Sequence, residues 1–308
     1  MSDNKKNHVG RPTNEEVKQR KIKKKLVFLV PIIIVIIVVT AILNTKPSKA
    51  VGKAFIDNSN KKYKKMGTIF VDKRYYIQLF SKMTAVQGIT TFDNYYMYTR
   101  SYPNDVEQKN TALVLASKDS PQNITKVFTN KAYGHANDIT YNTSNKNIYV
   151  ATAMGNTIIE IKKSDIYNSS KKYRIIKLPK KVSSIAYDKV YNRYYAGKGS
   201  NIYMFKSNFK LSKTMKKLYT WTPQGIETTL RRVLVINYKK VKKNNKTVFL
   251  NRIDVYNKSL SYVGTYEVIA DGELESISVD SNKLILLINR LGNDYDYIYQ
   301  TNIPANML

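Results

Sequence analysis

The chain has 308 residues, and its 52 Lys or Arg against 22 Asp or Glu give a formal net charge of +30. It contains no cysteine and two histidines, which excludes disulfides, thiolate metal sites and zinc sites that need several histidines. A P-loop, a dinucleotide fingerprint, a nucleophile elbow and a His-Glu-x-x-His motif are also missing from the sequence. These exclusions favour a binding protein over the common enzyme classes.

Residues 1–25 form a basic segment with nine Lys or Arg against three Asp or Glu. We interpret this segment as cytoplasmic, because membrane proteins retain Lys and Arg on that side. The alternative is a minor-groove DNA contact made by Gly10–Pro12 and the lysines around it. One Gly-Arg-Pro triplet is a weak motif, so nucleic acid is the less favoured partner.

Residues 26–43 are predicted to form a transmembrane helix. Leu26–Leu43 carries no charge, and fifteen of its eighteen residues are Leu, Ile, Val or Phe. At about 1.5 Å per residue the helix would be roughly 27 Å long, close to the thickness of a bilayer core. No second apolar run of this length follows. We therefore expect a single-pass protein of the cell membrane, with the N-terminus inside and the C-terminal domain outside.

Residues 44–60 are expected to be a linker. A cleaved secretory signal is the alternative to an anchor, with Ser48 and Ala50 as the small residues at the cleavage site. The apolar run is longer than the usual 7–15 residues, which favours the uncleaved anchor. Both interpretations place the rest of the chain outside the cytoplasm.

Residues 61–308 read as all-β, because short β-branched and aromatic runs alternate with clusters of turn residues. Five similar segments each carry a polar patch before a central isoleucine: Gln87–Thr90, Asn137–Thr140, Ser183–Ala186, Gln224–Glu227 and Glu275–Ser278. The isoleucines are spaced by 50, 46, 41 and 51 residues. Periods of ~40–50 residues with several short strands are typical of β-propellers.

The predicted fold is therefore an all-β propeller of five or six blades, preceded by one N-terminal transmembrane helix. Residues 51–86 would supply either an extra blade or a strand that closes the ring with the C-terminus. A β-sandwich with irregular loops is the alternative fold. It would explain the strands but not their regular spacing.

The run Gly134–Asn142, followed by Asn147–Val150, resembles the blade-opening motif of bacterial extracytoplasmic propellers of the NHL and lactonase-like kind. The resemblance covers roughly residues 87–300. It implies a propeller that binds or scaffolds, since most members of this group do so. A minority are lyases or hydrolases that use metal, or His and acidic groups, at the central channel.

Polar residues at the openings of the five repeats are the candidate site, because the innermost strands of a propeller converge on one axis. The candidate ligand-binding residues are His135, Asn137, Asp138, Glu227 and Glu275. Their oxygen atoms would suit Ca²⁺ or Mg²⁺, and Ca²⁺ is the cofactor considered. Alternatively, His135 would form an acid/base pair with Glu227 or Glu275, which a hydrolase or lyase requires. A third interpretation, in which these residues only satisfy turns and backbone groups, stays open.

The excess of lysine predicts anionic partners. Basic runs recur outside the N-terminal segment, for example at Lys61–Lys65 and Lys239–Lys243. We expect an anionic envelope polymer, the membrane surface or a protein as partner. Three functions remain at this point: a membrane-anchored binding module, an extracytoplasmic hydrolase or lyase, and a secreted bacteriocin-like propeller. The last of these would require removal of residues 1–50.

Overall fold

The computed structural model describes residues 63–308 except for 72, 79–82, 102–110, 171, 218–220, 244–245, 291–294 and 305–306. All described residues belong to one compact unit, which spans Lys53–Leu308. The predicted cytoplasmic segment, membrane helix and linker (residues 1–60) lie outside them. Within the described residues, no helix combines the length and the apolar character that crossing a membrane needs.

The described strands form five sheets, the first three of which consist of strands consecutive in the chain. The first contains β3 (Ala85–Phe92), β4 (Tyr95–Ser101), β5 (Thr111–Ser117) and β6 (Ile124–Asn130). The second contains β7 (Asp138–Asn142), β8 (Asn147–Ala151), β9 (Thr157–Lys162) and β10 (Arg174–Lys177). The third contains β11 (Ser184–Asp188), β12 (Arg193–Lys198), β13 (Asn201–Lys206) and β14 (Leu211–Lys216).

The last two sheets each include a strand from the N-terminal part of the domain. The fourth contains β15 (Thr222–Thr228), β16 (Arg232–Lys243), β17 (Lys246–Asn257), β18 (Tyr262–Val268) and β1 (Lys65–Ile69). The fifth contains β19 (Glu273–Asp280), β20 (Lys283–Asn289), β21 (Tyr295–Asn302) and β2 (Lys73–Gln78). Two short helical elements connect strands on the rim, η1 (Lys131–Tyr133) and α2 (Lys163–Tyr167).

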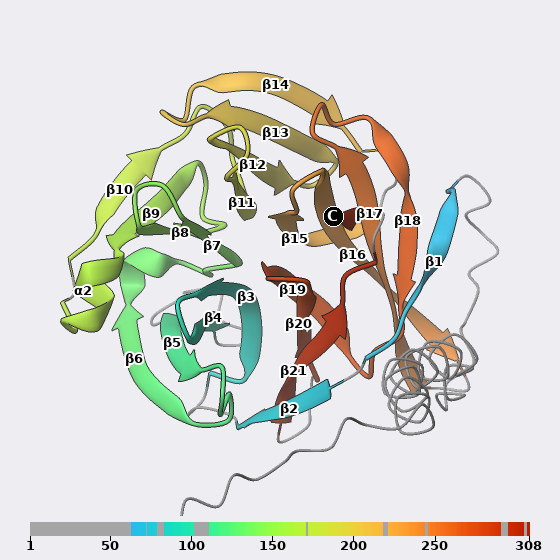
Figure 1. Ribbon diagram of the computed structural model, residues 1–308, viewed down its shortest axis with the longest axis horizontal. Coiled ribbons are helices and arrows are strands. Elements are labelled where there is room, and N and C mark those ends of the chain that lie inside the picture. The colour runs from blue at the N-terminus through green and yellow to red at the C-terminus, as the bar shows by residue number, and fades with distance from the viewer. Residues whose placement is uncertain are drawn as a thin grey trace, which may run out of the picture. The chain divides into compact units, whose positions relative to one another are not determined.

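The five sheets are the blades of a β-propeller, arranged around a central axis (Figure 1). Strands β3, β7, β11, β15 and β19 are innermost, and each contacts the next around a closed ring. The propeller prediction is confirmed with five blades, and the β-sandwich alternative is wrong. Each of the five repeated isoleucines lies in an innermost strand and is at most 2% exposed.

Local sequence explains the hairpins within the blades. Between β7 and β8, Asn142 Oδ1 accepts hydrogen bonds from the backbone N–H groups of Ser144 (2.8 Å) and Asn145 (3.2 Å). Lys146 completes this turn with a φ of 61°. Asn side chains favour such turns because they replace a backbone acceptor. The strands on either side bury alternate Ile, Val and Tyr residues between blades.

The N-terminal part of the domain closes the ring instead of forming another blade. Strand β2 pairs antiparallel with β21, from Lys73↔Gln300 to Gln78↔Tyr295. Strand β1 pairs parallel with β18 and adds a fifth strand to the fourth blade. Of the two predicted roles for residues 51–86, the closing strand is therefore confirmed. A buried ion pair of Arg100 Nη1 with Asp296 Oδ2 (3.2 Å) also joins the first and last blades.

Candidate functional site

The innermost strands all run in the same direction along the axis, so the channel has two distinct mouths. We call the mouth where these strands begin the N-side mouth, and the mouth where they end the C-side mouth. At the N-side mouth, Asn137 Nδ2 donates to the Gln224 carbonyl oxygen (3.0 Å) and Gln224 Nε2 donates to Glu273 Oε1 (2.7 Å). Residues that precede the repeated isoleucine thus meet on one side, and those that follow it meet on the other.

Asp138 lies at the axis between the two mouths. Its Oδ2 accepts hydrogen bonds from the backbone N–H groups of Ile185 and Ile226, both at 3.1 Å. Its Oδ1 accepts from the backbone N–H of Ile139 and from Ser276 Oγ, both at 3.0 Å. One carboxylate therefore connects the innermost strands of four blades.

Ser276 extends this network to the remaining blade. Its Oγ accepts a hydrogen bond from the backbone N–H of Ile89 (3.2 Å) in β3. A carbon at the Cβ position of Gly88 would lie 2.7 Å from Asp138 Cα, so the strands approach too closely for a side chain there. We call Asp138 and Ser276, with the four backbone N–H groups they bind, the axial hub.

The environment of Asp138 fits a structural role. Its carboxyl group is fully buried, and burial raises its pKa well above the ordinary value, while the hydrogen bonds from Ile226, Ile185, Ser276 and Ile139 oppose that shift. Each oxygen already accepts two hydrogen bonds from the protein. A ligand that used these oxygens would have to replace bonds that hold the blades together.

Glu275 lies at the N-side mouth but is only 2% exposed. Its Oε1 accepts from Asn289 Nδ2 (3.0 Å), and burial followed by the negative charge of Glu273 raises its pKa well above the ordinary value. The Glu273 carboxylate in turn contacts Lys240 Nζ at 3.5 Å. Within the described residues there is no group of three His, Cys, Asp or Glu side chains that would hold a metal ion. A Ca²⁺ site stays a prediction.

His135 and Asn137 also lie on the N-side. The His135 backbone N–H donates to the Thr152 carbonyl oxygen (2.9 Å), which fixes the chain between η1 and β7. Burial first, and then the positive charge of Lys198, lowers the pKa of His135, which favours the neutral imidazole.

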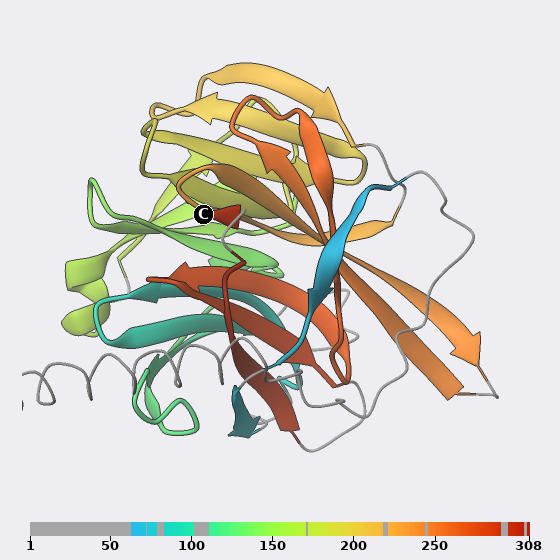
Figure 2. The same ribbon diagram turned by 45° about the vertical axis from the view of Figure 1, so that its right-hand side comes forward.

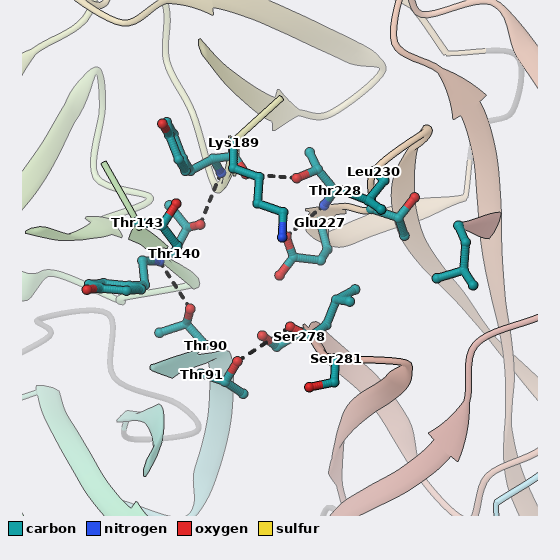
Figure 3. Close-up of a pocket in the computed structure, with 15 residues that line it drawn as sticks. Thr90, Thr91, Thr140, Thr143, Lys189, Glu227, Thr228, Leu230, Ser278 and Ser281 are labelled. Carbon is teal, nitrogen blue, oxygen red and sulfur yellow. Dashed lines mark hydrogen bonds between the residues drawn. The ribbon is translucent and has the colours of Figure 1, made fainter. Parts of the chain in front are cut away.

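The C-side mouth contains a cavity of about 190 Å³ (Figure 3). Hydroxyl-bearing side chains from several blades dominate its lining. Two of them also hold neighbouring blades together: Thr90 Oγ1 accepts from the Tyr141 backbone N–H (3.1 Å), and Thr140 Oγ1 accepts from that of Tyr187 (3.0 Å). The cavity is further lined by Thr228, Thr229, Ser278, Ser281, Lys189 and Glu227.

Glu227 is the only acidic side chain among the described residues that line this cavity. Five equivalent positions directly follow the repeated isoleucine, and they hold Thr90, Thr140, Ala186, Glu227 and Ser278. Glu227 Oε1 accepts from the backbone N–H of Thr228 (2.7 Å). Burial raises the pKa of Glu227 to about 7, against opposing hydrogen bonds from Thr228, Ser278 and Val279 and the charge of Lys258. A small change in its surroundings would therefore switch this group between hydrogen-bond donor and anion near neutral pH.

The structure separates the five predicted residues. Asp138 is at the axis, Glu227 is at the C-side mouth, and His135, Asn137 and Glu275 are on the N-side. The geometry does not bring His135 and Glu227 together as an acid/base pair, because the axial hub lies between them. Sequence reasoning missed the hydroxyl lining. An alignment of the five repeats would have revealed it, since Thr or Ser fills three of the five equivalent positions.

Of the comparisons with known proteins, similarity to one solved structure supports the fold and shows nothing more. No protein-family model matches the chain, and no curated protein matches it. Among solved structures, glutaminyl cyclase from Myxococcus xanthus is similar with a TM-score of 0.53 and 8% identity, over 76% of this chain and 97% of that one. Regucalcin from Agrobacterium tumefaciens, described as a calcium-binding protein, has a TM-score of 0.43 and 10% identity over 77% and 97% of the two chains. The chain is a five-bladed β-propeller.

Proposed function

We propose that this chain is a single-pass membrane protein whose β-propeller lies outside the cell and binds a small polyhydroxylated molecule, such as one sugar unit, at the C-side mouth. The apolar run Leu26–Leu43 behind a basic segment supports the membrane anchor. The observation that carries the binding role is Glu227, the only acid among the five equivalent inner-strand positions, inside a cavity lined with hydroxyl groups.

The lining determines the class of ligand. The hydroxyl groups of Thr90 and Thr140 accept backbone N–H groups, so they can still donate a hydrogen bond to a polyol. Those of Thr228 and Thr229 donate to backbone carbonyl oxygens, so they can accept one from it. Glu227 adds an acceptor when ionised, and Lys189 adds a donor at the rim. A cavity of about 190 Å³ is smaller than the ~300–1,000 Å³ of drug-sized pockets, which fits a single small molecule.

Calorimetric titration of the full chain in detergent with a panel of monosaccharides and linear polyols tests this proposal. We expect binding by at least one member of the panel, and a loss of about tenfold or more in Glu227→Gln, because a hydrogen bond to a charged group contributes about 1.5–3 kcal/mol. Asp271→Asn is the matched control, since its side chain is 66% exposed and pairs with Arg290. Absence of binding throughout the panel, or equal affinity in Glu227→Gln, would overturn the proposal.

Catalysis is the second candidate, and the pKa of Glu227 favours it. A carboxyl group with a pKa of about 7 has the value that suits a general acid or base at neutral pH. A hydrolase or lyase would then act at the C-side mouth through Glu227, without His135. Chemical analysis of the panel after incubation separates the two functions. A binding protein leaves each compound unchanged, whereas an enzyme forms a product, and the Glu227→Gln variant should form none.

A further inference from the structure

The hairpin formed by β16 and β17 extends beyond its own blade. These two strands have 12 residues each, whereas the neighbouring strands β15 and β18 have seven. The last pair with β15 is Thr222↔Tyr238, and the pairing with β18 begins at Asn251↔Val268. The five pairs from Lys239↔Leu250 to Lys243↔Lys246 lie past both points. Figure 2 shows this part of the hairpin projecting from the propeller; we call residues 239–243 and 246–250 the finger.

The finger is strongly basic. It contains five lysines, and no Asp or Glu occurs anywhere from Thr228 to Ile253. All five cations are Lys and none is Arg. Lysine ammonium groups act as point charges with no fixed fork geometry, which suits a surface of many anionic groups better than one specific carboxylate or phosphate.

Contacts between side chains of the finger, of β16 and of β19 hold the base of the finger in place. Lys240 Nζ lies 5.6 Å from the ring centre of Tyr238 and 5.4 Å from that of Phe249, and it contacts Glu273 Oε2 at 3.5 Å. The Tyr238 and Phe249 ring centres are 6.2 Å apart. Beyond this cluster, Lys242 and Thr247 are exposed. The finger therefore extends from a fixed support at the N-side of the propeller.

The length of the finger requires a functional explanation, because the rest of the fold adds little to the stability of these strands. An isolated two-stranded hairpin is marginally stable in water, and no strand of the described chain pairs with residues 239–243 or 246–250 from outside the hairpin. Lysines on open strand edges discourage aggregation. That protective role explains the choice of lysine but not the extra length, since a shorter hairpin would need no protection.

We propose that the finger docks the propeller on an anionic membrane surface. This inference rests on the membrane anchoring of the proposed function and is independent of the C-side ligand. Residues 44–62 separate the predicted span from the first described residue, and 19 residues reach at most roughly 65 Å when fully extended. Strand β1, which follows this spacer, belongs to the same blade as the finger. The tether would thus keep the lysines at high local concentration near the lipid headgroups.

Vesicle sedimentation of residues 53–308 tests the finger without the predicted span. This fragment contains both β2 and β21, and therefore the complete closed ring. The vesicles are phosphatidylcholine alone, or phosphatidylcholine with phosphatidylglycerol. We expect binding only to the second kind, and a loss of about a hundredfold when Lys242, Lys243 and Lys246 are changed to Gln, from the affinity that each lysine contributes near an anionic surface. High salt should weaken the binding of the unchanged fragment.

The matched control changes three exposed lysines to Gln, namely Lys177 at the end of β10 and Lys180 and Lys181 in the loop that follows it, because the change in charge is identical. An equal loss in both triple variants would overturn the proposal by assigning the binding to total charge. Tighter binding to inorganic polyphosphate than to vesicles would overturn it in favour of a soluble polyanion. If the fragment does not bind anionic vesicles while the full chain still fractionates with membranes, the finger proposal is wrong and the proposed membrane anchor is supported.

Discussion

In each of the five innermost strands, the residue before the repeated isoleucine and the residue after it belong to two different layers of the channel. In the layer before it, Asp138 and Ser276 connect all five blades and leave the carboxylate oxygens of Asp138 fully occupied. In the layer after it, Glu227 lines a cavity and has a pKa raised to about 7. Two acids of the innermost strands thus differ: Asp138 holds the ring together, and Glu227 lines the cavity of the proposed binding site.

The largest expected effect tests the structural half of this comparison. Asp138→Ala should lower the free energy of unfolding by about 3–5 kcal/mol, because it leaves the buried N–H groups of Ile185 and Ile226 without their acceptor. Denaturant titration followed by tryptophan fluorescence measures this, with Glu227→Ala as the comparison. If Glu227→Ala destabilises the protein as much as Asp138→Ala, the two layers do not differ in their contribution to the fold.

The pH dependence of stability tests the other half. Folding raises the pKa of Glu227 from 4.5 to about 7, so the folded state keeps its proton over a range in which the unfolded chain has lost it. Stability is therefore expected to fall as the pH rises from about 4.5 to about 7, by up to ~3 kcal/mol, and this contribution stays level above that range. Glu227→Gln should make the slope shallower, whereas Asp271→Asn should not. An unchanged slope in Glu227→Gln would show that another group titrates.

A pair of serine variants sharpens the comparison with the smallest change. Ser276→Ala removes the acceptor of the Ile89 N–H and a donor to Asp138, so we expect a loss of about 1–3 kcal/mol. Ser278→Ala, two residues later in the same strand, should cost less stability. It should raise the pKa of Glu227 further, because the Ser278 hydroxyl group favours the ionised carboxylate. NMR titration of the Glu227 side chain and thermal unfolding distinguish these outcomes.

Much of the fold could be predicted because the repeated isoleucine has one physical role in every blade. Each occupies a buried position of an innermost strand, so the spacing of Ile89, Ile139, Ile185, Ile226 and Ile277 measures the blades directly. The sequence predicts five or six blades and cannot decide between them, because nothing in it shows that β1 and β2 join existing blades instead of forming a sixth. Their pairing with β18 and β21 links residues about 200 positions apart or more, and no local pattern indicates it.

The site was less predictable, because the mouth that a residue reaches depends on whether it precedes or follows the repeated isoleucine. His135, Asn137 and Asp138 precede the isoleucine of their repeat, whereas Glu227 follows its own. Residues on the two sides of one position reach different mouths, so grouping them by sequence proximity mixed the N-side with the C-side. The sequence could not show that the carboxylate oxygens of Asp138 already accept hydrogen bonds, because the donors Ile185, Ile226 and Ser276 come from three other blades.

Strand β1 has a mechanical consequence for a tethered propeller. A pull transmitted from before Tyr63 reaches β1 on the fourth blade before it reaches β2, the strand that completes the ring with β21. The parallel contact between β1 and β18 would take the tension first and yield first. In a chain anchored as proposed, the pairing of β2 with β21 would therefore bear no load until β1 has separated from β18, and the closed ring would outlast the first break.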